Sequence, residues 1–225
     1  MKFLNDIILF YTFFMVLEVL QIADKAINSG QSTAMIIVMP DAQTGEKGYF
    51  NNIDKTWNYE DFFFQEFIPF IETKYRIKPE KRFRAIAGLS MGGAGSFIYA
   101  LRYPKYFSSC CPLSASLEPL AFEDFYKKDV NSGFRRDIAY NYFSNHNALF
   151  LIKNQTEKKL KSVNWYIDCG DDDFLFEGNS LVHIALKKRQ IAHEYRVRDG
   201  GHSWSYWRSA LPRVLEFVSS TFHQN

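Results

Sequence analysis

Four short, largely apolar runs and one mixed segment, separated by longer amphipathic segments, constrain the fold of this chain more than any other feature. The four runs span 35–39, 83–88, 107–113 and 163–169, and the mixed segment, a fifth predicted strand, spans 193–197. The first is a continuous apolar stretch ended by Pro40, as in a strand that is buried on both faces. Strands that alternate with helices form βαβ units, so the pattern predicts an α/β domain with a mostly parallel sheet. A length of 225 residues fits one domain, 1–225.

The amphipathic segments predict helices over 59–75, 91–102, 180–189 and 204–222. In the first of these, Asn58 is expected to cap the start and Pro69 to kink the helix. Pro212 is expected to bend the last one. Residues 115–160 are mixed and polar with weak periodicity, and we expect them to form an irregular region that covers one edge of the domain.

Charge and cysteine content exclude several classes of protein. The chain has 27 Lys and Arg against 25 Asp and Glu, and a net charge of +2 is too balanced for a nucleic-acid binder. Three cysteines, an odd and low number, do not form a disulfide scaffold. No Cys/His group has zinc-ligand spacing, so we expect no metal.

The N-terminus, residues 1–22, is unusually apolar. Residues 7–17 are too few to span a bilayer, which takes about 20, so we expect no stable membrane span. The segment has the length of a signal-peptide core, but no clean cleavage site follows it. It is therefore a buried strand or helix, a signal peptide, or the product of a mis-assigned gene start. Secreted, periplasmic and cytoplasmic locations all stay open.

The sequence Gly88-Leu89-Ser90-Met91-Gly92 follows a predicted strand and opens a predicted helix. A strand, a sharp turn and a helix are what a nucleophile elbow needs, and glycines on both sides of Ser90 avoid clashes in that turn. The alternative is a glycine-rich turn with an idle serine. On the first interpretation Ser90 is a nucleophile, and the backbone N–H of Met91 is an oxyanion donor.

A serine nucleophile needs a base and a group that orients the base. Of the five histidines, His202 lies just beyond the fifth predicted strand on a glycine loop, which makes it the strongest candidate for the base. Three carboxylates, Asp171, Asp172 and Asp173, follow the fourth strand, and only one of them can reach His202. The order Ser, Asp, His along the chain is that of α/β-hydrolases.

Four stretches of the sequence resemble a known enzyme family. IIVMPD (36–41), RAIAGLSMGG (84–93), CGDDDFL (169–175) and GGHSWSYWR (200–208) are similar to the esterase branch of the α/β-hydrolase superfamily. That branch holds esterase D-like S-formylglutathione hydrolases, feruloyl and acetyl-xylan esterases of carbohydrate esterase family one, and mycolyltransferases.

The resemblance implies a three-layer α/β sandwich and a Ser-His-Asp acyl-enzyme mechanism without metal or organic cofactor. The family's Cys-Gly-x-x-Asp-Phe-Leu pattern selects Asp173 from the three carboxylates. Trp204 could wall a substrate pocket or anchor the last helix in the core. Tyr49 and Asn51 resemble a family segment near the cleft and are candidate substrate contacts.

One departure from the family stands out. The family takes its second oxyanion donor from a His-Gly loop after a central strand, and this chain has no histidine before His146. The first strands of the family fold have no counterpart here, and a gap in the sheet would leave buried N–H and C=O groups unpaired. We therefore expect residues 5–11 to occupy the vacant central position, with a helix from Thr12 onward.

The expected activity is cleavage of carboxylic esters, with acyl groups on carbohydrate or small alcohols. Alternatives on the same triad are an acyltransferase and a thioesterase similar to S-formylglutathione hydrolase. A truncated, weakly active or non-catalytic homologue is a further alternative. The expected partner is a small-molecule or carbohydrate ester, and the sequence leaves a homo-oligomer open.

Overall fold

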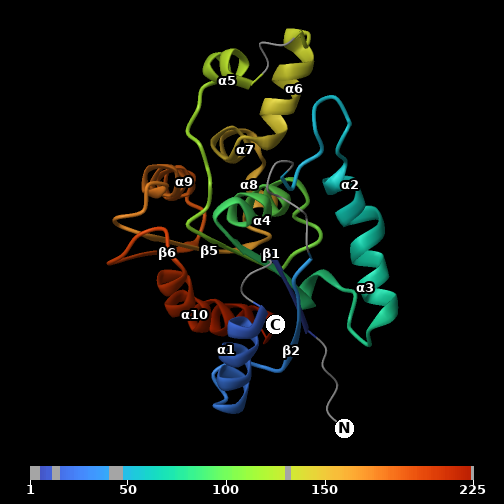
Figure 1. The fold of residues 1–225 in the computed structure, drawn as a ribbon, viewed down its shortest axis with the longest axis vertical. Helices are drawn as coiled ribbons and strands as arrows, with labels where there is room; N and C mark the ends of the chain where they lie inside the picture. The colour runs from blue at the N-terminus through green and yellow to red at the C-terminus, as the bar shows by residue number, and fades with distance from the viewer. Residues whose placement is uncertain (1–5, 12–15, 41–47, 130–132, 224–225) are drawn as a thin grey trace.

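The computed structural model describes residues 6–11, 16–40, 48–129 and 133–223, and in them a six-stranded sheet forms the centre of the molecule (Figure 1). The strand order is β2-β1-β3-β4-β5-β6, and every pairing between neighbours is parallel. The strands are β1 (Asp6–Tyr11), β2 (Met35–Val38), β3 (Arg84–Leu89), β4 (Ser109–Leu113), β5 (Asn164–Gly170) and β6 (His193–Arg198). All five predicted strands are present as β2 to β6, with boundaries shifted by one or two residues.

Strand β1 occupies the central position between β2 and β3. Its residue Leu9 pairs with Val38 on one side and with Ile86 on the other. Both rows of backbone groups on β1 therefore have partners, as a buried sheet requires. This confirms that the N-terminal segment supplies the missing strand. The predicted helix follows as α1 (Val16–Asn28), and its expected start at Thr12 lies outside the described residues.

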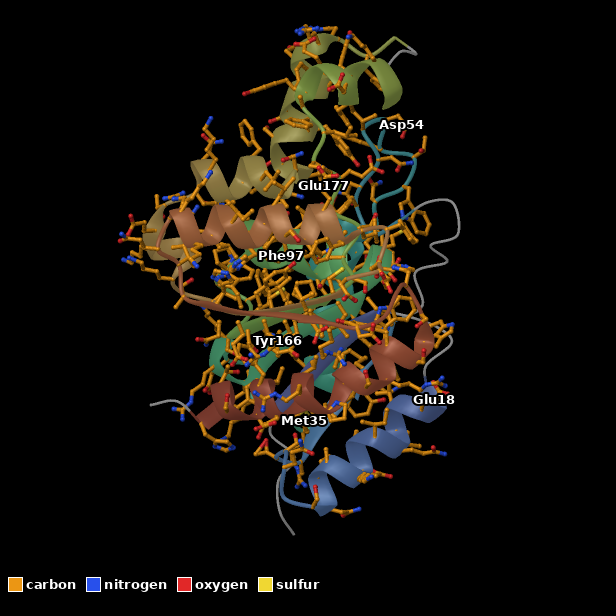
Figure 2. The ribbon with its side chains drawn as sticks, turned by 90° about the vertical axis from the view of Figure 1, so that its left-hand side faces the viewer. Glu18, Met35, Asp54, Phe97, Tyr166 and Glu177 are labelled. Carbon is orange, nitrogen blue, oxygen red and sulfur yellow. The ribbon has the colours of Figure 1, made fainter. Side chains whose placement is uncertain are left out.

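Helices cover the sheet on both faces and give the expected three-layer sandwich. Helices α1 and α10 (Trp204–His223) lie on one face. On the other face lie α2 (Tyr59–Phe62), a π-helical segment (Phe63–Phe67), α3 (Ile68–Lys74), α4 (Ser90–Arg102), α7 (Ala148–Asn154) and α9 (Phe176–Lys188). Figure 2 shows Phe97 and Tyr166 on opposite sides of the sheet, each inside one of the two apolar layers.

The side chains of β3 alternate between the two apolar layers on either face of the sheet. Ile86 packs into the layer under α4, whereas Ala85, Ala87 and Leu89 pack into the layer under α10. All six residues of β3 are buried, because successive side chains of a strand point to opposite faces and helices cover both.

The helix expected over 59–75 differs in detail from the prediction. Pro69 lies in the first turn of α3, and a π-helical turn precedes it, because proline cannot donate the N–H that a regular helix needs. The Asn58 side chain donates to the Lys55 carbonyl and does not cap the helix. The Oδ1 atom of Asn51 accepts the Asp61 N–H instead, at 3.2 Å.

The prediction of an irregular region over 115–160 is wrong. This part of the chain contains α5 (Phe122–Asp129), α6 (Arg136–His146), α7 and α8 (Glu157–Leu160). Aromatic side chains of α5 and α6 pack on one another, with ring centroids of Phe122 and Phe143 5.6 Å apart. The two helices bury aromatic residues against each other above the domain (Figure 1), and the rest of each helix is largely polar, so the segment has a mixed composition in the sequence.

No helix within the described part of the chain is both long enough and apolar enough to cross a membrane.

Candidate active site

Ser90 stands where the strand order of the sheet reverses. From β1 the chain crosses to β2 on one side, and from β3 it continues to β4, β5 and β6 on the other side. In open α/β sheets, ligands bind outside the carboxyl ends of the strands at such a switch point. Ser90 directly follows the last residue of β3 and begins α4, which places it at this point.

The turn at Ser90 is strained. Its φ angle is +54°, a left-handed conformation that side-chain-bearing residues seldom adopt. A Cβ added at Gly88 would lie 2.2 Å from the Gly92 carbonyl oxygen, so a side chain at this position would clash with the start of α4. The structure thus has the sharp strand-to-helix turn that the sequence predicts, with glycine where the backbone comes close to itself.

Three side chains that are far apart in the sequence meet beside this turn. The Nε2 atom of His202 lies 2.9 Å from the Oγ atom of Ser90. On the other side of the ring, Nδ1 lies 3.1 and 3.0 Å from the two carboxylate oxygens of Asp173. A carboxylate can only accept, so Nδ1 carries a proton and donates it, and Nε2 is left to accept from the Ser90 hydroxyl.

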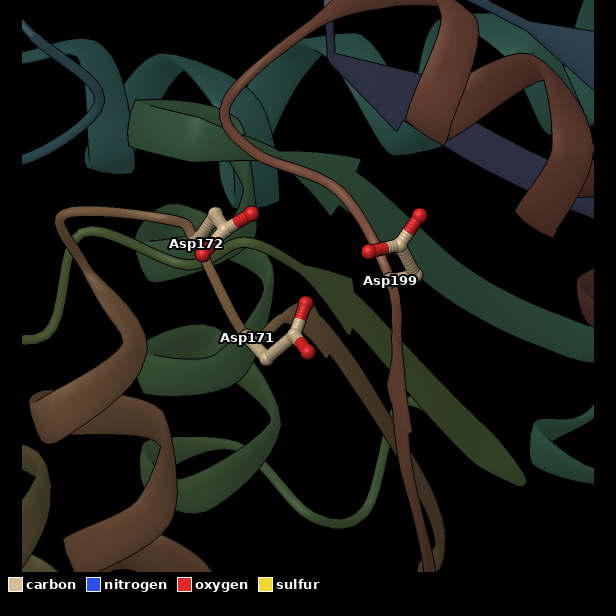
Figure 3. Close-up of side chains that lie close together, drawn as sticks. All are labelled: Asp171, Asp172 and Asp199. Carbon is tan, nitrogen blue, oxygen red and sulfur yellow. The ribbon is translucent and has the colours of Figure 1, made fainter.

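The three carboxylates on the loop after β5 lie in different environments. Asp173 is buried, and its Oδ1 also accepts the Leu175 N–H at 2.9 Å. Asp171 and Asp172 are exposed and lie together with Asp199, as Figure 3 shows. Asp171 accepts the Gly200 N–H at 3.1 Å, so it supports the loop that carries His202 without contacting the imidazole.

Aromatic side chains surround the imidazole of His202. The ring of Phe174 lies 4.6 Å from it and Trp207 contacts it edge-on at 4.8 Å, both between centroids. Trp207 is buried and donates its Nε1–H to the Ser114 hydroxyl at 3.0 Å. Trp204 is 37% exposed and packs edge-on against Trp207. Trp207 therefore anchors the last helix, while Trp204 borders the site.

Sequence analysis missed Phe174. This side chain is 77% exposed, the largest exposed fraction among the big apolar residues described. Its position directly after Asp173, within the family's Asp-Phe-Leu pattern, was the signal that could have pointed to it.

Tyr49 and Asn51 do not reach the triad. Tyr49 is buried against Gly95 of α4, and its carbonyl oxygen accepts a hydrogen bond from the Tyr99 hydroxyl. Asn51 supports the start of the helix at Tyr59. Tyr49 thus packs against α4, and no hydrogen bond joins either side chain to Ser90 or His202 among the described residues.

A cavity of about 290 Å³ lies next to α4, and Ser90, Asp173 and His202 are not among its lining residues. Ala94, one helical turn after Ser90, lines it, and so does Ser116, whose N–H donates to the Ser90 carbonyl at 3.0 Å. Aromatic residues such as Phe50 and Phe143 and polar residues such as Glu118 and His146 share its walls. A cavity of this size can hold part of a small molecule.

The backbone N–H of Met91 belongs to the first turn of α4, where N–H groups have no partner within the helix. The segment after β1, from which a second oxyanion donor is expected, lies outside the described residues. The described cysteines are poorly placed to act as nucleophiles. All three are free and buried, and burial raises the pKa of Cys169 to about 12.

Comparison with known proteins identifies the family of this chain. Residues 12–218 match the family model described as "Putative esterase". The chain belongs to the esterase family. As a member of that family and of the α/β-hydrolase superfamily, it is a carboxylic ester hydrolase.

The esterase is similar to proteins with different acyl groups in their names. It is 28% identical to an acetyl esterase of Caldicellulosiruptor saccharolyticus over 76% of this chain and 67% of that one. A ferulic acid esterase structure is 33% identical, with a TM-score of 0.82 over 98% of this chain and 86% of that one. The Staphylococcus aureus S-formylglutathione hydrolase shares the fold at 19% identity, with a TM-score of 0.71 over 97% and 85%.

Proposed function

We propose that this esterase cleaves its substrate through an acyl-enzyme, with Ser90 as nucleophile, His202 as base and Asp173 as the group that orients the base. The observation that carries the proposal is the chain of hydrogen bonds from Ser90 Oγ to His202 Nε2 and from His202 Nδ1 to Asp173. All three distances are near 3 Å, within reach for proton transfer.

In the first step Ser90 Oγ attacks the ester carbonyl carbon, and His202 Nε2 takes the hydroxyl proton. The Met91 N–H stabilises the negative charge that develops on the carbonyl oxygen. The imidazolium then gives its proton to the leaving alcohol, and the acyl group stays on Ser90. Asp173 stabilises the imidazolium and is not itself protonated.

In the second step water attacks the acyl carbon. His202 takes a proton from the water and returns it to Ser90 Oγ, and the carboxylic acid leaves. No redox change occurs, and protein side chains supply every proton transfer.

The cavity next to α4 is the proposed site of the acyl group. Its aromatic walls bury an apolar acyl chain or ring, and its volume of about 290 Å³ accepts groups larger than acetyl. The alcohol half of the ester then lies toward Phe174 and Trp204, which are exposed. Sugars pack against such aromatic faces, so the proposed substrates are acylated carbohydrates and esters of small alcohols. The acyl groups in the names of the similar proteins, acetyl and ferulic acid, differ in size.

The test is hydrolysis of p-nitrophenyl acetate and of larger acyl esters by the wild-type protein and by Ser90→Ala. We expect the variant to fold and to lose turnover by about a thousandfold or more. A fluorophosphonate probe should label the wild type and not the variant. Equal turnover by both proteins would refute the proposed nucleophile. Adding an alcohol acceptor or a thioester distinguishes transferase and thioesterase activity.

A further inference from the structure

A second carboxylate, which the proposed reaction does not use, is fully buried under the site. Asp168 lies on β5 with no exposed surface. Its Oδ1 accepts the Tyr206 hydroxyl at 2.6 Å and the Arg198 Nη2 at 3.0 Å, and its Oδ2 accepts the Tyr166 hydroxyl at 2.8 Å. Burying a charge is costly unless it is paired, and these three donors are what makes this burial tolerable.

Two of the three donors lie at opposite ends of the loop that carries His202. Arg198 is the last residue of β6, and Tyr206 lies in the first turn of α10. Residues 199–205, with His202 among them, form the whole connection between these two points. The guanidinium of Arg198 also lies 4.3 Å above the centre of the Tyr206 ring, which links the two ends directly.

The ring of Tyr206 packs tightly against this loop. Gly200 has a φ of +130°, and a Cβ added there would lie 3.0 Å from Tyr206 Cδ2. A Cβ added at Gly170, at the end of β5, would lie 1.9 Å from the Gly200 carbonyl oxygen. The loop has no space to shift toward the sheet, so the position of the Tyr206 ring fixes the backbone two residues before His202.

The protonation states favour a permanent contact. Burial, and then the hydrogen bond to Asp168, raise the pKa of Tyr206 well above its usual value. Burial lowers the pKa of Arg198, but the hydrogen bond and charge of Asp168 outweigh this and the net shift is upward. Both side chains therefore stay donors over the whole range in which an esterase works.

We propose that Asp168 is a positioning residue: through Arg198 and Tyr206 it fixes both ends of the loop that holds His202 within reach of Ser90 and Asp173. This inference rests on the proposed role of His202 as base. An error of about 1 Å in the placement of a catalytic group can cost about a hundredfold in rate, so loss of either contact should lower turnover.

Tyr166 provides a matched control within the same network. It donates to the same carboxylate, but it comes from β5 itself, and its ring packs against Phe217 of α10. Tyr206→Phe and Tyr166→Phe each remove one hydroxyl and one hydrogen bond to Asp168. A purely stabilising network predicts the same consequence for both variants, whereas a positioning role predicts different ones.

The experiment measures kcat, KM, the pH dependence of kcat/KM and the melting temperature of both variants with p-nitrophenyl acetate. We expect Tyr206→Phe to lower kcat about tenfold or more with little change in KM. In Tyr206→Phe, the acid limb of the plot of kcat/KM against pH should move to lower pH, because an imidazolium that has shifted away from Asp173 is less stabilised. Tyr166→Phe should keep kcat within about twofold and should lower only the melting temperature. Equal kcat values for the two variants would overturn the inference.

Two further variants keep the test decisive. If Tyr206→Phe does not fold, Arg198→Gln alters the other end of the loop at a partly exposed side chain, and wild-type kcat in that variant would overturn the inference as well. Ser90→Ala separates the two proposals. Turnover by Ser90→Ala would refute the proposed function itself, whereas an inactive Ser90→Ala with equal tyrosine variants would refute only the positioning role.

Discussion

The imidazole of His202 lies 2.9 Å from the hydroxyl of Ser90, although 112 positions separate the two residues in the chain. Both residues follow the carboxyl ends of parallel strands, β3 and β6, and Asp173 follows β5 in the same way. Parallel strands end at one edge of the sheet, so three residues with no local relationship in sequence meet there. The predictions below test this arrangement and the packing that supports it.

Asp173→Asn should lower kcat by about a thousandfold or more while the fold is kept. An amide in this place can present its N–H to Nδ1 and so favour the wrong tautomer, and it cannot stabilise the imidazolium. Steady-state kinetics with a circular dichroism spectrum would measure this. Asp172→Asn is the matched control at the adjacent exposed position, and its kcat should stay within about twofold of the wild type. Comparable losses in both variants would contradict the role given to Asp173.

Phe174→Ala should raise KM severalfold and leave thermal stability nearly unchanged. The side chain is 77% exposed, so its removal opens little core, but it also removes an aromatic face beside His202. Phe70→Ala removes another exposed phenylalanine, 54% exposed and on α3, and serves as the control. Kinetics on an acylated sugar and on methyl acetate would show the effect, with the larger change for the sugar. An unchanged KM for both esters would exclude Phe174 from substrate binding.

Gly88→Ala should destabilise the protein by about 3 kcal/mol and abolish activity, because the new methyl group would overlap the Gly92 carbonyl in backbone that cannot yield. Urea denaturation measures the loss. Gly201→Ala is the control for stability, since a Cβ there would meet its nearest neighbour at 3.4 Å, an ordinary contact distance. Two variants of equal stability would mean that the elbow is less crowded than the structure indicates.

The free energy of unfolding should fall as the pH rises above about 10. Burial raises the pKa of Tyr99 well above its usual value of 10.0, so above that pH the unfolded chain releases a proton that the folded protein keeps. The stability linked to this proton is complete below pH 10 and decreases above it. Tyr99→Phe should make the alkaline slope shallower by about 1.4 kcal/mol per pH unit, as measured by urea denaturation from pH 8 to 11. Tyr140→Phe, at an exposed position of α6, should keep the wild-type slope.

The local pattern of the sequence determined most of the architecture. Short, largely apolar runs predicted the interior strands β3, β4 and β5, because a strand buried on both faces is mostly apolar along its length, and the edge strands β2 and β6 were predicted from the same alternation of strands and helices. The elbow at Ser90 was predicted too, since only glycine can occupy position 88 beside the start of a helix. Even β1 was predicted correctly, because the hydrogen-bonding groups of its neighbours required a central strand.

Only the tertiary structure decided which way individual side chains point and which residues far apart in the chain are in contact. Asp171, Asp172 and Asp173 are chemically identical, and the way the chain turns after β5 determines which of them faces His202. Helices α5 and α6 escaped prediction because their aromatic residues pack on one another across the two helices, a contact that the local sequence does not reveal. Asp168 accepts hydrogen bonds from Arg198 and Tyr206, which follow it in the chain by 30 and 38 positions. Periodicity reports which face of an element is buried, whereas contacts of this kind exist only once separate elements have packed together.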